Sequence, residues 1–145
     1  MRKTYRGRYK PKNPHKYIGD ITNIIYRSLW ERKFMIFCDS TQSILKWASE
    51  EIIIPYFYSI DKKVHKYYVD FIIQLKENDG SLKTYIIEIK PYIQTIEPKK
   101  RKCTKKYIKE LVEWEKNKSK WLSADKYAKD KNWEFKILTE KELFK

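Results

Sequence analysis

Two apolar runs separated by a turn signal constrain the fold of this chain more than any other feature. The segment YYVDFIIQLKENDGSLKTYIIEIKP holds strand-like runs at 66–76 and 82–90, joined by ENDGS. Runs rich in β-branched and aromatic residues that meet at Asp-Gly predict an antiparallel hairpin. The hairpin carries Asp70, Glu88 and Lys90 near one end. Charged groups are rarely buried unless they are paired or bind a metal.

The length of the hairpin loop decides whether these charges meet. Side chains alternate along a strand, so Asp70 shares a face with Ile72, and Glu88 shares one with Lys90. A two-residue loop would turn Asp70 away from Glu88. A three-residue loop ending in Gly80 would set the two acids opposite each other, and glycine readily adopts the positive φ that such a loop needs.

Opposed carboxylates repel each other, so the three-residue loop requires a cation between them. Lys90 is one candidate, and a hard divalent ion such as Mg²⁺ or Mn²⁺ is the other, because such ions prefer oxygen ligands. The alternative is a rim of solvated charges held near the strand ends by Lys90.

Helices and further strands are expected on both sides of the hairpin. Before the hairpin, the expected elements are a helix within 20–39 that Ser28 could cap, a strand within 44–60 that closes at Pro55 or shortly after, and a polar connection at 59–66. After the hairpin, they are a helix from Tyr107, a helix over 123–132 capped by Ser123, a strand at 133–138 and a helix at 139–144 opened by Thr139. This order predicts an α/β fold with a mixed central sheet, flanked by helices, in one domain spanning 1–145.

The charge balance points to a polyanionic partner. The formal net charge is +14, from 33 basic and 19 acidic residues, which favours nucleic acid or an anionic membrane surface, with simple solubility as the alternative. No apolar run approaches the roughly 18 residues of a membrane span, so nucleic acid is the leading partner. The two cysteines and two histidines form no metal-ligand spacing, so no zinc site is expected.

Two segments concentrate the basic residues. Residues 1–19 contain no acid and are expected to form an irregular basic arm, or else a disordered tail, while residues 99–106 hold six Lys or Arg in eight positions. We expect both to contact the DNA backbone without reading bases, which would make binding strongly salt-dependent. The residues expected to bind DNA are Arg2, Lys3, Arg6, Arg8, Lys10, Lys12, Lys16, Lys99, Lys100, Arg101, Lys102, Lys105 and Lys106.

The order of Asp70, Glu88 and Lys90, D-x17-E-x-K, resembles the PD-(D/E)XK nuclease superfamily, with Val69 where many members have proline. A helix carrying Glu31, in RSLWERKF, precedes the sheet, which is similar to the TnsA-like branch. The ordered series RSLWE, FC, W, EE, IPY, YYVDF and IEIKP resembles the head completion nucleases of T-even-type tailed phages over roughly residues 5–98. The resemblance implies a restriction-endonuclease-like fold.

The same resemblance implies hydrolysis of DNA phosphodiesters with Mg²⁺ or Mn²⁺. Asp70 and Glu88 would bind the metal together with the backbone carbonyl of Ile89. Lys90 would act on the attacking water or on the developing charge. Glu31 would be a further metal ligand or an orienting acid. For Glu31 the alternative is a capping box with Ser28 or a solvated helix face.

The expected partner is double-stranded DNA, together with head or portal proteins of the phage, and no membrane. The expected location is the host cytoplasm, with possible association with the virion. The alternative function is a non-catalytic, DNA-binding structural protein of the phage head, and the presence of all four candidate catalytic residues favours the nuclease. The sequence leaves open the DNA end structure, the number of metal ions and the oligomeric state.

Overall fold

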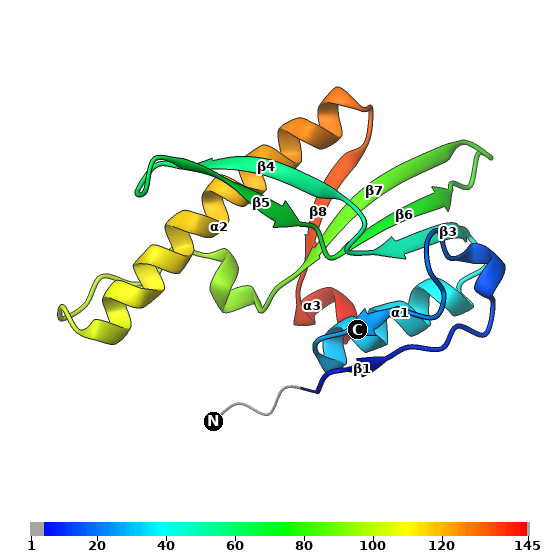
Figure 1. Cartoon of the computed structure of the whole chain (residues 1–145), viewed down its shortest axis with the longest axis horizontal. Coiled ribbons are helices and arrows are strands. Elements are labelled where there is room, and N and C mark those ends of the chain that lie inside the picture. The colour runs from blue at the N-terminus through cyan, green and yellow to red at the C-terminus, as the bar shows by residue number, and fades with distance from the viewer. Residues whose placement is uncertain (1–4, 145) are drawn as a thin grey trace.

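A four-stranded mixed sheet forms the centre of the computed structural model, which describes residues 5–144 (Figure 1). The strand order is β3-β6-β7-β8, with bounds β3 (Ile44–Ser49), β6 (Phe71–Lys76), β7 (Leu82–Ile89) and β8 (Glu134–Leu138). The first three strands are antiparallel, and β8 runs parallel to β7. The predicted α/β fold with a mixed sheet and an antiparallel hairpin is confirmed.

The hairpin between β6 and β7 has the three-residue loop. Phe71 pairs with Ile87, and the Glu77 N–H donates to the Ser81 carbonyl at 2.8 Å. Gly80 takes the positive φ of +87° that closes the loop. Continuing this register by one residue past Phe71 sets Asp70 across from Glu88.

Each face of the sheet is covered by a different helix. One core gathers side chains of α1 (Leu29–Ser40), such as Phe34, with Phe71 and Ile87 of the sheet. The other gathers Ile86 with Ala124 and Ala128 of α2 (Lys105–Asp130). Because side chains alternate along β7, Glu88 shares its face with Ile86 and lies on the side of α2.

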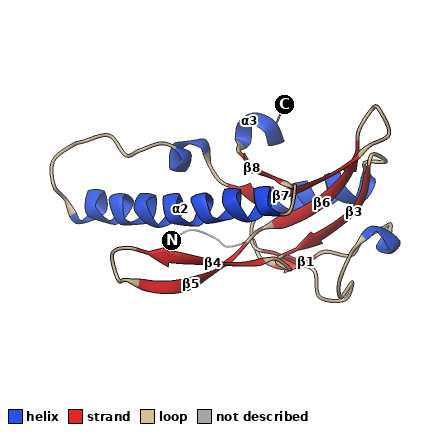
Figure 2. Cartoon of the chain, turned by 90° about the horizontal axis from the view of Figure 1, so that it is seen from above, coloured by secondary structure: helices blue, strands red, loops and turns tan. Residues whose placement is uncertain are grey.

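A two-stranded ribbon leaves the main sheet between β3 and β6. It consists of β4 (Ile53–Tyr58) and β5 (Lys63–Tyr68), and it lies along α2 (Figure 2). The single strand predicted within 44–60, closing at Pro55 or shortly after, is therefore wrong, because Glu50 adopts a positive φ of 56° and breaks it. The predicted polar connection at 59–66 and continuous strand at 66–76 are also wrong, since β5 occupies 63–68 and the chain bends at Asp70.

The ribbon exists because its inner face is apolar. Along β4, buried and exposed side chains alternate, and the buried Ile54, Tyr56 and Tyr58 pack in the core that contains α2. The Glu50 N–H donates to the Asp70 carbonyl at 3.1 Å, and the Val69 N–H donates to the Ile52 carbonyl at 3.1 Å. These bonds join the point where the chain leaves the main sheet to the point where it returns.

The helices match the sequence predictions in part. Ser28 caps α1, but the segment before it is the short strand β2 (Ile25–Tyr26), paired with β1 (Gly7–Arg8), and not a helix. The two helices predicted after Tyr107 are one helix of 26 residues, in which Ser123 is an interior residue and Thr104 is the cap. The strand β8 and the short helix α3 (Glu140–Leu143), capped by Thr139, are confirmed. Within residues 5–144, no helix combines the length and the apolarity needed to cross a bilayer.

The described part of the predicted arm, residues 5–19, is packed against α1 rather than free. Asp39 at the end of α1 accepts hydrogen bonds from the Tyr9 hydroxyl at 2.8 Å and from the Lys12 N–H at 2.7 Å. A single turn of 3-10 helix, η1 (Pro14–Lys16), follows. Arg2 and Lys3 of the predicted DNA-binding set lie outside the described residues.

The position of Lys16 contradicts the prediction that it binds DNA. Its side chain is buried, and its Nζ donates to the carbonyls of Cys38, Asp39 and Thr41 at 2.6, 3.0 and 2.8 Å. These carbonyls lie at the C-terminus of α1, where helix carbonyls lack intrahelical partners and a positive charge is favourable. Lys16 therefore caps a helix and has no donor left for a phosphate.

We expect Lys16→Met to lower the free energy of unfolding by about 1–3 kcal/mol, because buried carbonyls would lose their donors. Urea denaturation followed by circular dichroism measures this change. Lys10→Met removes an exposed lysine from the same segment and serves as the matched control. Equal transition midpoints for the two variants would contradict the capping role.

Candidate active site

The carboxylates of Asp70 and Glu88 lie close together where the β4–β5 ribbon ends and the β6–β7 hairpin begins. Asp70 occupies the bend between β5 and β6, and its Oδ2 accepts a hydrogen bond from the Ile89 N–H at 2.8 Å. Glu88 is buried at 6% exposure, and its Oε2 accepts a short hydrogen bond of 2.5 Å from the Tyr67 hydroxyl. Asp70 is thus held by β7 and Glu88 by the ribbon strand β5, and the two acids face each other as the three-residue loop predicted.

Burial and mutual repulsion make both charged acids costly. Removal from water raises the pKa of Asp70 well above its usual value, and the charge of Glu88 raises it further, while the Ile89 N–H opposes the shift. Burial also raises the pKa of Glu88, against the hydrogen bond from Tyr67 and the charges of Lys90 and Lys120. A site that penalises two negative charges is suited to binding a positive one.

Lys90 lies beside this acid pair, as the sequence predicted. Its Nζ is 3.8 Å from Glu88 Oε1. Its backbone N–H donates to the Leu138 carbonyl at 3.0 Å, which ties the end of β7 to the end of β8. The side chain is partly exposed, so its ammonium is anchored near the acids and still open to a ligand.

Glu31 is close to the acid pair but is held by its own helix. The Ser28 hydroxyl accepts from the Glu31 N–H at 3.1 Å and donates to Glu31 Oε2 at 3.2 Å, so the helix cap at Ser28 is present and the Glu31 carboxylate bonds to the Ser28 side chain. Burial raises the pKa of Glu31, and the nearby charge of Glu50 adds to this shift. The charge of Glu31 in turn raises the pKa of Asp70, so the two carboxylates lie within electrostatic reach.

The donor set fits a hard divalent cation in part. Asp70 and Glu88 supply two oxygen donors, and Mg²⁺ commonly takes one or two carboxylates and completes its shell with water and substrate phosphate. Among residues 5–144, no three side chains of the His, Cys, Asp and Glu types come close enough together to hold a metal by themselves. The carboxylates that the structure brings together here are Asp70 and Glu88, two of the oxygen donors that a metal would need, and within the described part of the chain no hydrogen bond or ion pair joins Glu31 to them.

The sequence comparisons identify the family. The profile described as TnsA-like endonuclease N terminal matches residues 41–140. The chain belongs to the TnsA-like endonuclease family. It is also 37% identical over 141 residues to the "Head completion nuclease" of Enterobacteria phage T4, a match that covers 94% of this chain and 91% of that protein. The resemblance inferred from the sequence is thereby confirmed, and the fold is that of a TnsA-like nuclease domain.

Two residues of this TnsA-like site escaped the sequence analysis. Tyr67 and Lys120 both act on Glu88, Tyr67 through its hydrogen bond and Lys120 through its charge. Alternation along a continuous strand over 66–76 would place Tyr67 on the side opposite Asp70, so it pointed away from the site; the bend at Asp70 breaks this alternation. Lys120 carries no local signal, because it comes from α2 and only tertiary packing brings it to the site.

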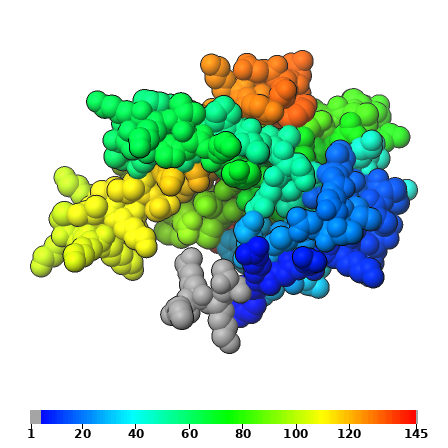
Figure 3. All heavy atoms as spheres, in the orientation of Figure 1, coloured from blue at the N-terminus to red at the C-terminus, as the bar shows by residue number. Residues whose placement is uncertain are grey.

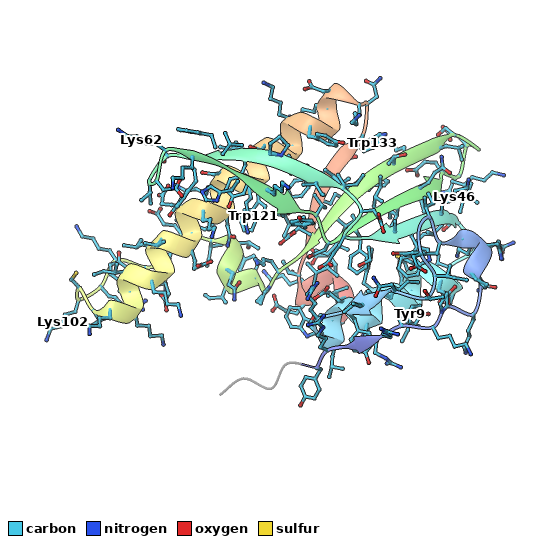
Figure 4. All side chains as sticks on the ribbon, in the orientation of Figure 1. Tyr9, Lys46, Lys62, Lys102, Trp121 and Trp133 are labelled. Carbon is cyan, nitrogen blue, oxygen red and sulfur yellow. The ribbon has the colours of Figure 1, made fainter. Side chains whose placement is uncertain are left out.

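The remaining predicted DNA-binding residues of the TnsA-like domain lie at its two ends. Figure 4 shows Lys102 beyond the outer end of α2 and Tyr9 at the opposite end of the molecule. Arg101 is engaged with Glu110 at 2.9 Å and packs over the Tyr107 ring. The other lysines of 99–106 are exposed, as are Arg6, Arg8, Lys10 and Lys12. In Figure 3 the outer half of α2 protrudes from the body of the molecule.

Proposed function

We propose that this chain is a divalent-metal-dependent nuclease that hydrolyses phosphodiester bonds of double-stranded DNA during phage head completion. The buried Asp70–Glu88 pair with Lys90 beside it carries the proposal. The family supports the nuclease activity, and the name of the phage T4 relative supports the role in the head. Head or portal proteins are the partners that such a role implies.

Each residue of the site has a proposed task. Asp70, Glu88 and the Ile89 carbonyl would hold Mg²⁺ or Mn²⁺. When bound, the ion supplies Lewis-acid polarisation and lowers the pKa of a bound water. Tyr67 orients Glu88, because burial and the charge of Glu88 raise the pKa of its hydroxyl and keep it a donor. The Lys90 ammonium stabilises the negative charge that develops on the attacked phosphate.

Of the two tasks that the resemblance implied for Glu31, metal ligand or orienting acid, we propose the second. In its bonded position by Ser28, it adds negative potential to the site. Direct metal binding by Glu31 would require its carboxylate to leave the Ser28 hydroxyl, and we propose that it acts as an orienting acid for water at the centre.

Plasmid cleavage tests the proposed function. Supercoiled plasmid is incubated with the protein and Mg²⁺, Mn²⁺, Ca²⁺ or EDTA, and nicked and linear products are separated on agarose. We expect products with Mg²⁺ or Mn²⁺ and none with EDTA. Tight DNA binding without cleavage under any of these metals would replace the nuclease with the non-catalytic, DNA-binding head protein.

The exposed lysines of 99–106 are expected to bind DNA phosphates. Changing Lys99, Lys100 and Lys102 to Ala should weaken binding of a 20-base-pair duplex and reduce the slope of log K against log salt by about one for each phosphate that the variant no longer neutralises. Fluorescence anisotropy in Ca²⁺ measures both quantities. The matched control changes Lys46, Lys76 and Lys83, which are also exposed. Equal slopes for the two triple variants would contradict the prediction.

A further inference from the structure

Lys120 is a lysine of α2 whose side chain is partly buried. It shares the inward helix face with Ala124 and Ala128, four and eight residues on, and both alanines are fully buried in the core beneath the ribbon. α2 therefore carries this ammonium inward, toward the sheet face that bears Glu88.

The neighbours of Lys120 belong to the active site. Its Nζ lies 5.5 Å from the ring centroid of Tyr67 and 5.9 Å from that of Tyr56. Tyr67 is the residue that donates to Glu88. The charges of Lys90 and Lys120 both act on Glu88. Two ammonium groups thus surround one buried carboxylate, and only Lys90 forms an ion pair with it.

Lys120 lacks an anionic partner of its own among residues 5–144. None of the ion pairs within 4.0 Å includes it. Burial lowers its pKa, and the charge of Lys90 lowers it further. A protein interior does not favour a half-buried ammonium beside a second one unless an anion is there to meet them.

A bound divalent ion would increase the excess of positive charge around the site. The charges of Asp70 and Glu88 would then be neutralised by the ion, which leaves Lys90 and Lys120 with no negative counterpart at the centre. The missing negative charge is that of a phosphate. Preorganised cations in a partly dry site of this kind stabilise a phosphate whose charge grows during the reaction.

We propose that Lys120 binds a nonbridging oxygen of the DNA phosphate that is cleaved, and that it does so from the side of the site formed by α2. This inference rests on the proposed nuclease function and extends it by a second cation at the same phosphate. The rings of Tyr67 and Tyr56 lie beside its ammonium, which would face the phosphate together with that of Lys90.

The test compares Lys120→Met and Lys120→Arg with Lys126→Met. Met preserves the apolar stem, Arg preserves the charge, and Lys126 is an exposed lysine of the same helix. With a short duplex and Mg²⁺, we expect Lys120→Met to lower kcat by about 100-fold, the effect of removing one stabilising donor. Arg should restore part of the loss, and Lys126→Met should match wild type. In EDTA, Lys120→Met should reduce the salt slope of duplex binding by about one.

The outcomes separate this inference from the proposed function. If Lys120→Met cleaves DNA at the wild-type rate and binds it with an unchanged salt slope, the phosphate contact is ruled out and the proposed nuclease function is unaffected. Loss of cleavage with an unchanged slope and a lowered thermal midpoint assigns Lys120 to structure alone and also overturns the inference. If wild type cleaves nothing, the proposed function fails, and the salt slope in EDTA still decides whether Lys120 contacts DNA.

Discussion

Asp70→Asn and Lys90→Ala should each reduce Mg²⁺-dependent plasmid cleavage by at least about 100-fold. Asparagine keeps the size of aspartate and an oxygen that can accept from the Ile89 N–H, so the local fold is preserved while the proposed metal ligand loses its charge. Lys90→Ala removes the ammonium that lies 3.8 Å from Glu88. Initial rates of nicking measured at several Mg²⁺ concentrations report both losses.

Two surface variants serve as controls for this result. Asp130→Asn changes an exposed acid at the end of α2, and Lys126→Ala changes an exposed lysine of the same helix. Both should cleave at the wild-type rate. Asp70→Asn should shift the Mg²⁺ dependence to higher concentrations, whereas Lys90→Ala should lower the rate at saturating Mg²⁺. Wild-type nicking by either site variant would move the chemistry away from this carboxylate pair.

Asp70→Asn should also stabilise the metal-free protein, by about 0.5–2 kcal/mol at pH 8 in EDTA. In the folded state, burial and the charge of Glu88 raise the pKa of Asp70 above its value in the unfolded chain. The ionised carboxylate therefore costs stability above the folded-state pKa, and that stability returns as pH falls toward the unfolded-state pKa. Asparagine carries no such cost at any pH.

Thermal unfolding in EDTA between pH 8 and pH 5 measures this effect. The advantage of Asp70→Asn over wild type should shrink as pH falls, because wild-type Asp70 takes up its proton. Asp39 behaves in the opposite way: although burial opposes it, hydrogen bonds from Lys12 and Tyr9 lower its pKa, so its contribution is lost at acidic pH in both proteins. Adding Mg²⁺ should stabilise wild type more than the variant. A variant less stable than wild type in EDTA would contradict the strained acid pair.

The parts of the fold that local sequence determines could be predicted. The hairpin register follows from the loop that ends in Gly80, and that register alone brings Asp70 to Glu88. The caps Ser28 and Thr139 were recognisable because each is a hydroxyl residue three positions before a glutamate. These features depend on a few neighbouring residues, so the sequence contains what is needed to find them.

The features set by tertiary packing could not be predicted. The apolar run over 44–60 gives no sign that one residue, Glu50, turns the chain out of the main sheet. Ser123 resembles a cap by composition, but the continuous packing of α2 against β4 and β8 carries the helix through it. Lys16 counts as surface charge in any sum over the sequence, whereas its ammonium is buried against helix carbonyls.

The hydrogen bond between Glu50 and Asp70 closes the base of the β4–β5 ribbon. The chain leaves the main sheet and returns to it at one place, where the Glu50 N–H donates to the Asp70 carbonyl. The position of Asp70 therefore does not depend on the length of the ribbon. Its outer turn, at 59–62, is exposed, and the Lys62 N–H donates a hydrogen bond to the Tyr58 carbonyl there. Insertions at that tip should leave Asp70 and Glu88 where they are, so this part of the domain can vary in length without altering the candidate active site.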